Sequence, residues 1–175
     1  MSSIFMELAC LLTKRSQGGP AKVAIFASAL FGTISGSSAG NVYTTGPKAD
    51  GSAWRVGVEN PWPGEDAPQY VQTVELTGGD SLIVSGDYQR YFTYEGKRYS
   101  HLIDLTTGCP AAYYSSVAVY SSPDEGLGDL FSTALFCLPP EQSRQVADDN
   151  GLAVLWLGTD GEVAGQTDNW PGKAV

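Results

Sequence analysis

The residues best suited to chemistry gather between positions 85 and 110, where the chain's only histidine, His101, lies close to two aspartates and several tyrosines. Histidine is the side chain whose ordinary pKa lies near neutrality, so His101 is a candidate general base for activating a hydroxyl group. The alternative is a loop histidine that hydrogen bonds with Asp104. Both interpretations place His101 just after a hairpin that turns at Glu95-Gly96.

A second candidate is the pair Asp129 and Thr133, which are spaced i, i+4. A helix places both side chains on one face, one turn apart. A carboxylate and a hydroxyl in this arrangement suit Mg²⁺, which takes oxygen ligands and commonly binds one carboxylate together with phosphate. The alternative is that Thr133 hydrogen bonds to a carbonyl of its own helix while Asp129 faces solvent.

Short strands must position the first group of residues. Segments rich in β-branched and aromatic residues, separated by Gly, Pro, Asp and Asn, predict strands at Asn41–Thr45, Ala53–Glu59, Tyr70–Leu76, Ser81–Val84, Tyr88–Tyr94 and Lys97–Tyr99. Another strand is expected at Tyr113–Tyr120.

Two helices are expected near the C-terminus. Ser122 as N-cap, Pro123 at the first helical position and Glu125 form a capping box, which predicts a helix from about Pro123 to Leu138. A second helix at Glu141–Asp149 precedes two further strands, Ala153–Leu157 and Glu162–Thr167. The order of elements predicts an α+β fold with a mixed, largely antiparallel sheet and two C-terminal helices.

Composition narrows the classes of partner. The chain has 175 residues and a formal charge of −9, and its 10 basic residues are scattered, which argues against binding nucleic acid. An anionic dinucleotide could still bind through backbone amides or a bridging divalent cation. Three cysteines are too few for a structural zinc site, so Cys137 is interpreted as packing and Cys109 as a loop residue.

Nothing near the N-terminus predicts a compartment. The apolar run Val23–Ile34 is shorter than the roughly 20 residues that a membrane-spanning helix needs. Lys14-Arg15 before this run imitates an export signal, but the apolar patch Ile4–Leu12 lies ahead of the basic pair and departs from the usual order.

Four motifs occur in the order found in the FAD:protein FMN transferases, the ApbE family, and the chain resembles that family from about residue 39 to residue 166. The motifs are Gly40-Asn41-Val42-Tyr43, Trp54-Arg55-Val56-Gly57-Val58 with Pro61, the stretch from Ser85-Gly86-Asp87-Tyr88 through His101 to Gly108-Cys109-Pro110, and Gly128-Asp129-Leu130-Phe131-Ser132-Thr133-Ala134-Leu135-Phe136. Leu105 stands where the family usually has proline.

The resemblance implies an activity and roles for these residues. It implies transfer of FMN from FAD to a threonine or serine hydroxyl of a target protein, with Mg²⁺ on the phosphates. It also implies that Asp129 and Thr133 are metal ligands and that His101 lies near the flavin.

The same resemblance places a flavin near two further segments. Ser85, Gly86, Asp87 and Tyr88 would line a flavin edge, because glycine permits close backbone approach and tyrosine can stack on the ring. They equally fit the start of a hairpin with the tyrosine in the core. Gly40 and Asn41 allow the same two interpretations.

The N-terminal part has a different resemblance. Residues 18–46 resemble the large permease subunit of TRAP-type transporters, and residues 1–38 lack the Asp-x-Gly-x-x-x-Lys-Gly element that the flavin transferases carry. We therefore expect an arm of permease-like origin at 1–38 and a partial flavin transferase domain at 39–175. Little activity is expected from such a chain alone. The alternative is a non-catalytic fragment, or a subunit whose cleft a second chain completes, and association with membranes stays open.

Overall fold

Five antiparallel strands form the largest sheet of the computed structural model, which describes residues 40–62, 67–123 and 128–175. The strands in spatial order are β1 (Asn41–Tyr43), β4 (Ser81–Gly86), β9 (Ser116–Ser121), β10 (Ala153–Leu157) and β11 (Val163–Gln166). The central strands are buried on both faces, since β10 is buried at every position. Such a strand needs a layer of structure on each side of the sheet.

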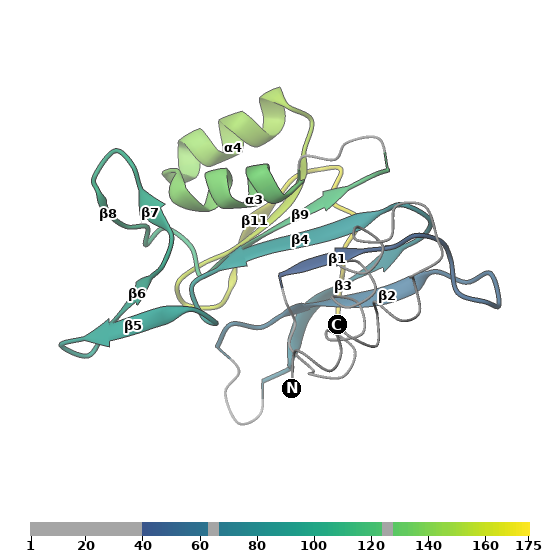
Figure 1. Ribbon diagram of the computed structural model, residues 1–175, viewed down its shortest axis with the longest axis horizontal. Coiled ribbons are helices and arrows are strands. Elements are labelled where there is room, and N and C mark those ends of the chain that lie inside the picture. The colour runs from purple at the N-terminus through teal and green to yellow at the C-terminus, as the bar shows by residue number, and fades with distance from the viewer. Residues whose placement is uncertain (1–39, 63–66, 124–127) are drawn as a thin grey trace, which may run out of the picture. The chain divides into compact units, whose positions relative to one another are not determined.

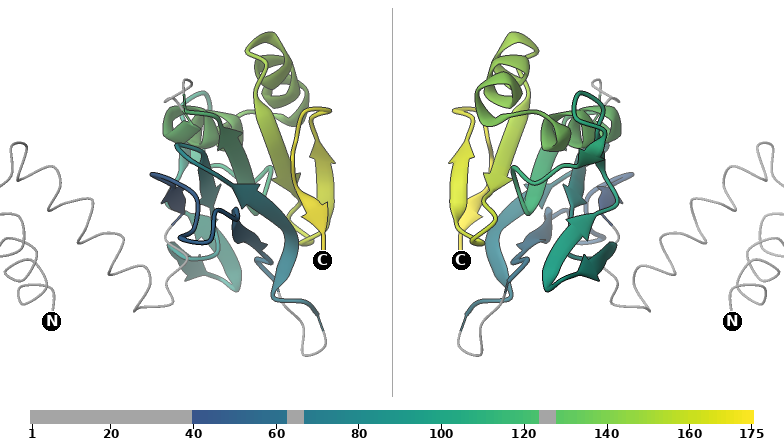
Figure 2. Two further views of the ribbon diagram at one scale, coloured as in Figure 1. Left: turned by 90° about the vertical axis from the view of Figure 1, so that its right-hand side faces the viewer. Right: turned by 90° about the vertical axis from the view of Figure 1, so that its left-hand side faces the viewer.

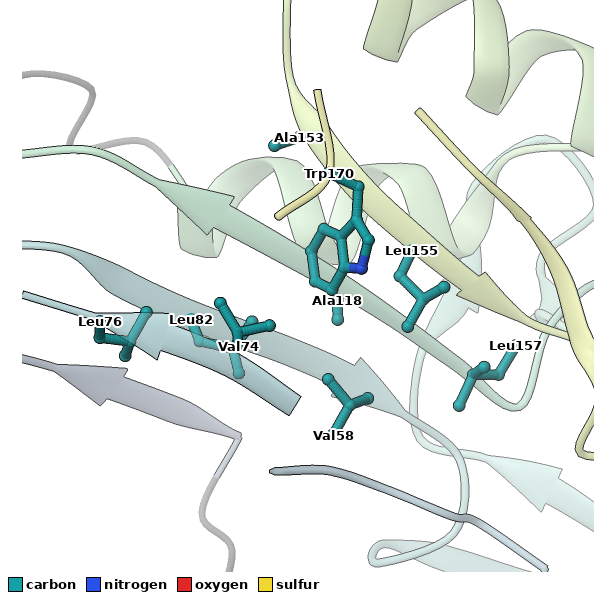
Figure 3. Packing of buried hydrophobic residues seen from close by; sticks show 9 residues of the cluster. All are labelled: Val58, Val74, Leu76, Leu82, Ala118, Ala153, Leu155, Leu157 and Trp170. Atoms are coloured by element: carbon teal, nitrogen blue, oxygen red, sulfur yellow. The ribbon is translucent and has the colours of Figure 1, made fainter. Parts of the chain in front are cut away.

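A smaller sheet covers one face. Its order is β12 (Lys173–Ala174), β3 (Tyr70–Leu76) and β2 (Trp54–Glu59), again antiparallel. Apolar side chains from both sheets meet between them, as Figure 3 shows. The buried members are Val58, Val74, Leu76, Leu82, Ala118, Ala153, Leu155, Leu157 and Trp170.

Helices α3 (Gly128–Cys137) and α4 (Pro140–Asp149) cover the opposite face of the large sheet (Figures 1 and 2). A second apolar cluster lies beneath them and takes the alternate residues of β9 and β10, including Val119 and Trp156. The indole Nε1 of Trp156 donates to Ser143 Oγ (2.9 Å), and Ser143 Oγ donates to the carbonyl of Leu135 (2.9 Å). These bonds join β10 to both helices.

A long excursion separates β4 from its neighbour β9. It contains the hairpin of β5 (Tyr91–Tyr94) and β6 (Lys97–Ser100), and then the short strands β7 (Ile103–Asp104) and β8 (Cys109–Pro110). In Figure 1 the hairpin extends away from the two larger sheets. His101 follows β6 directly, and the Glu95-Gly96 turn closes the hairpin between the paired residues Tyr94 and Lys97. Both sequence predictions about this hairpin are therefore confirmed.

The α+β prediction is confirmed, and most strands lie within two residues of their predicted ends. Two strand predictions were wrong at their starts. Tyr88–Arg90 are not part of β5, because Tyr88 folds back over Gly86. Tyr113–Ser115 precede β9 as irregular backbone.

Several predictions concern residues outside the described ranges. These are the capping residue Glu125, Cys10, the run Val23–Ile34 and the division at residue 38. Within the described ranges, Gly40–Val175 belong to one unit. No helix there has the length and apolar character needed to cross a bilayer. Cys137 is partly buried against the second apolar cluster, as expected for packing, and Cys109 is an exposed free thiol in β8 rather than in a loop.

Candidate functional site

Four of the predicted site residues converge at the edge of the large sheet under α3. Asn41 Nδ2 donates to Asp129 Oδ1 (3.1 Å), and Ser85 Oγ lies 3.2 Å from Thr133 Oγ1. Asp129 and Thr133 are exposed on one face of α3, as their spacing predicted. The structure thus brings two residues assigned to the cofactor together with the two assigned to the metal.

Strand pairing explains this convergence. Asn41 pairs with Ile83 in the β1–β4 ladder, so the ends of both strands lie under the same helix. Gly40 allows this close pairing, because its carbonyl accepts from the amide of Val84 and a Cβ there would collide with the Val84 carbonyl oxygen. Because successive side chains of a strand point to opposite faces, Ser85 points toward α3, while Val84 packs against the apolar cluster between the two sheets.

Thr133 does not form the helix-internal bond that the alternative interpretation assigned to it. The hydroxyl that bonds back to the helix is that of Ser132, which donates to the carbonyl of Asp129 (3.1 Å). Ser132 is fully buried, and its Oγ lies 2.9 Å from Ser85 Oγ. Thr133 is left with its oxygen on the exposed side of a short row of hydroxyl groups.

The charge balance at Asp129 favours a cation. In the parts of the chain that the structure describes, the one ion pair joins Arg98 and Asp87, so Asp129 faces an amide rather than a protein cation. Burial and the negative charge of Asp129 raise the pKa of Tyr43, which follows Asn41 on β1. Among the described residues, no three His, Cys, Asp or Glu side chains lie close enough together to hold a metal ion by themselves. A divalent cation held by Asp129 and Thr133 would therefore need phosphate oxygens or water to complete its shell.

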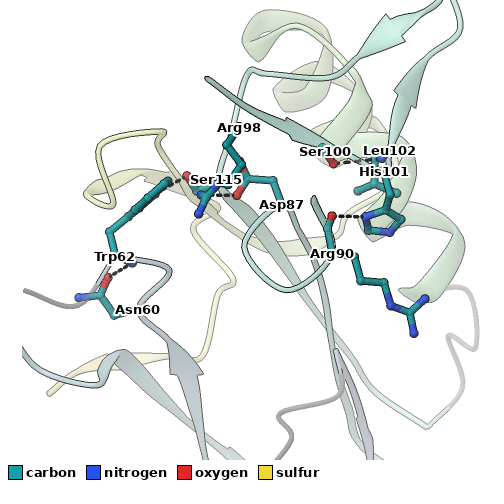
Figure 4. Close-up of polar contacts among 9 residues, drawn as sticks. All are labelled: Asn60, Trp62, Asp87, Arg90, Arg98, Ser100, His101, Leu102 and Ser115. Atoms are coloured by element: carbon teal, nitrogen blue, oxygen red, sulfur yellow. Dashed lines mark hydrogen bonds and ion pairs between the residues drawn. The ribbon is translucent and has the colours of Figure 1, made fainter. Parts of the chain in front are cut away.

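Asp87 forms an ion pair with Arg98 rather than a contact with the residues around Asp129. Its Oδ1 accepts from Arg98 Nη2 (2.9 Å), and the two side chains are only 17% and 15% exposed (Figure 4). Burial raises the pKa of the Asp87 carboxyl, and the Arg98 charge opposes this rise. The Arg98 guanidinium in turn lies 3.4 Å above the ring of Trp62 and 5.0 Å from that of Tyr91.

Tyr88 packs against its own strand. A Cβ at Gly86 would lie 2.6 Å from the Tyr88 ring, so glycine is needed for the ring to fold back. Burial, together with the negative charge of Glu59, raises the pKa of the Tyr88 phenol well above its ordinary value. Tyr88 thus supports the hairpin base in this structure, while Ser85 is the member of its motif that reaches Thr133.

This raised pKa predicts a loss of stability at alkaline pH. A phenol with a higher pKa in the folded state stabilises the fold below pH 10.0, its ordinary value, and this stabilisation is lost as the pH rises above it. Between its unfolded-state and folded-state pKa values, one such phenol lowers the free energy of unfolding by about 1.4 kcal/mol for each pH unit. We expect Tyr88→Phe to lose less free energy of unfolding than the unmodified chain between pH 9 and pH 11 in urea titrations. The exposed Tyr94→Phe is the matched control, and identical pH profiles for Tyr88→Phe and the parent would contradict the prediction.

His101 is exposed and does not pair with Asp104 as one interpretation proposed. Its Nδ1 lies 3.0 Å from the carbonyl oxygen of Arg90 (Figure 4). A carbonyl only accepts, so this contact requires a proton on Nδ1 and leaves Nε2 of the neutral ring as an acceptor. Asp104 instead accepts from the Thr106 amide (2.8 Å) and the Tyr113 hydroxyl (3.3 Å), and the Thr106 bond leads the contacts that lower the pKa of Asp104.

A cavity of about 420 Å³ lies elsewhere in the described part, lined by residues of α4, β10 and β11 such as Arg144, Trp156 and Gln166 and by the segment that follows β11. None of the predicted site residues lines it. The sequence analysis missed Tyr43 and Ser132 beside the candidate site. Alternation along β1 would have placed Tyr43 beside Asn41, and the i, i+3 spacing would have placed Ser132 beside Asp129.

Comparison of the chain with known proteins identifies its family. The sequence profile of the ApbE family matches residues 35–156. The chain belongs to the ApbE family. A FAD:protein FMN transferase of Klebsiella pneumoniae is 33% identical to it over 123 residues, which are 70% of this chain and 34% of that relative. The chain therefore spans about a third of the length of this curated relative.

Solved structures agree with the ApbE assignment. The crystal structure of the ApbE protein from Thermotoga maritima has a TM-score of 0.63 at 29% identity, over 75% of this chain and 41% of that one. The apo form of the flavinyl transferase ApbE from Pseudomonas stutzeri has a TM-score of 0.58 at 33% identity, over 78% and 43%. A second profile, the DctM component of tripartite ATP-independent periplasmic transporters, matches residues 1–57 and overlaps the ApbE match at 35–57.

Proposed function

We propose that this ApbE-family chain takes part in the transfer of FMN from FAD to a threonine or serine hydroxyl of a target protein. The observation that carries the proposal is the convergence of Asn41, Ser85, Asp129 and Thr133 at one sheet edge. The Asp129 carboxylate, which has no cationic partner among the described residues, lies next to an outward hydroxyl and fits a cation that also binds phosphate oxygens. FAD supplies such oxygens in its pyrophosphate.

Asp129 and Thr133 would hold Mg²⁺, which when bound would offset negative charge on the FAD phosphates. His101 would receive the proton of the target hydroxyl at Nε2, the ring nitrogen that the Arg90 contact leaves as acceptor. The hydroxyl oxygen would form a bond to the phosphorus of the FMN moiety, and the bond between that phosphorus and the bridging oxygen would break. The products are an FMN phosphoester on the target protein and AMP.

We further propose that residues 39–175 carry this chemistry and that residues 1–38 are an arm of separate, permease-like origin. The two profile matches give partial support, since the transporter match covers residues 1–57 and the ApbE match covers residues 35–156, and their overlap contains the proposed boundary.

Covalent flavin in a protein extract provides the test. The purified chain is incubated with FAD, Mg²⁺ and a bacterial extract freed of small molecules, and covalent flavin is detected by in-gel fluorescence while AMP release is measured. Because little activity is expected from this chain alone, we expect at most a weak fluorescent band that requires the chain, FAD and Mg²⁺. His101→Ala should remove this band without abolishing FAD binding. FAD binding with no band would favour the non-catalytic alternative, and no FAD binding would contradict a flavin function.

A further inference from the structure

We infer that Ser132 and Ser85 are positioning residues that fix the direction of the Thr133 hydroxyl and so prepare its oxygen to bind a cation. The inference rests on the proposed function, because it concerns the same candidate metal site. It assigns a role to Ser132, which is fully buried, and to Ser85, which was expected to line a flavin edge.

The direction follows from counting protons along the row of hydroxyl groups. Ser132 Oγ donates to the carbonyl oxygen of Asp129 (3.1 Å), and a carbonyl cannot donate in return. The single proton of Ser132 is thus used, so the contact of 2.9 Å between Ser132 and Ser85 requires Ser85 to donate. The proton of Ser85 is then used as well, and the contact of 3.2 Å with Thr133 requires Thr133 to donate.

The consequence concerns the lone pairs of Thr133. Its proton points inward to Ser85, so its oxygen presents only lone pairs on the exposed side of α3, where Asp129 also lies. A cation needs this orientation, because a hydroxyl proton pointing at it would be repelled. Without the row, the hydroxyl rotates among staggered positions, and part of the binding free energy would be spent on fixing it.

The row also ties the site to the fold. It begins at a fully buried side chain, Ser132, and ends at an exposed one, Thr133, and it crosses from α3 to β4 through Ser85. Asn41 acts similarly on the carboxylate, since its amide holds Asp129 Oδ1 and leaves the second oxygen for a ligand. Partners of this kind in metal sites commonly change metal affinity by about 10- to 100-fold when removed.

Titration of the full chain with Mn²⁺, a spectroscopic substitute for Mg²⁺, tests the inference through electron paramagnetic resonance of the free ion. We expect Ser132→Ala and Ser85→Ala each to weaken Mn²⁺ binding by about 10-fold. Ser85→Thr keeps a hydroxyl and should retain most of the affinity. Ser143→Ala is the matched control, because Ser143 is an equally buried helix serine that bonds Leu135 and Trp156. It should change thermal stability but not Mn²⁺ affinity.

A double-mutant comparison separates positioning from a general structural effect. If Ser132 acts through Thr133, then Ser132→Ala should cause no further loss of Mn²⁺ affinity in a Thr133→Ala background. An additional loss in that background would overturn the inference, and so would unchanged affinity in both serine variants while Asp129→Ala loses it. Unchanged affinity in Asp129→Ala would instead reject the metal site and with it this part of the proposed function.

Discussion

Replacing Asp129 with alanine is expected to weaken Mg²⁺-dependent FAD binding by about 100-fold, equivalent to about 2.7 kcal/mol. Of the four described residues that converge there, Asp129 alone carries a charge, since Asn41, Ser85 and Thr133 are neutral. Without its carboxylate, a cation would have to be held by a hydroxyl, water and the FAD phosphates alone. FAD fluorescence titrations with and without Mg²⁺ measure the effect.

The matched control removes an equal charge at a distance from the site. Asp148 is an exposed aspartate on α4 and lines the separate cavity, so Asp148→Ala should leave FAD binding unchanged. The binding that persists in EDTA should be equal in all three proteins, because it does not depend on the cation. Equal losses in both aspartate variants would show that overall charge, rather than a ligand at position 129, determines FAD affinity.

The sequence alone predicted that Asp129 and Thr133 share a helix face, but it did not predict which residues of other elements contact them. The spacing of Asp129 and Thr133 determines a shared helix face, which any helix would provide. The partners Asn41 and Ser85 come from positions 88 and 48 residues away from the α3 residues they contact, and the β1–β4 pairing and the packing of α3 on that sheet bring them close. Local pattern contains no information on that packing.

In the excursion between β4 and β9, the sequence predicted local structure well but not the roles of individual side chains. The sequence predicted the Glu95-Gly96 hairpin and the position of His101, because turn residues act locally. It could not choose between a flavin edge and a hairpin base for Asp87 and Tyr88. Their partners, Arg98 and Glu59, lie on other strands, and tertiary contacts rather than β propensity kept Tyr88 out of β5.

The second large effect is expected from Phe136→Ala, which should lower the free energy of unfolding by about 3–5 kcal/mol. Phe136 is fully buried on the inner face of α3, in the cluster with Val119 and Trp156. Removing its ring takes away apolar contact and leaves a cavity between the helix and the sheet. Single domains have about 5–15 kcal/mol in total, so the loss would be a large share. Urea unfolding followed by circular dichroism measures it.

Leu130→Ala on the same helix is the control, since Leu130 is 65% exposed and its removal should change stability by less than about 0.5 kcal/mol. Asp129 and Thr133 lie on α3, so weaker packing at Phe136 should also lower Mg²⁺-dependent FAD affinity at a temperature where the variant stays folded. Leu130→Ala should not. Stability losses of similar size in both variants would mean that Phe136 is not the main residue that packs α3 against the sheet. Other contacts would then have to position Asp129 and Thr133.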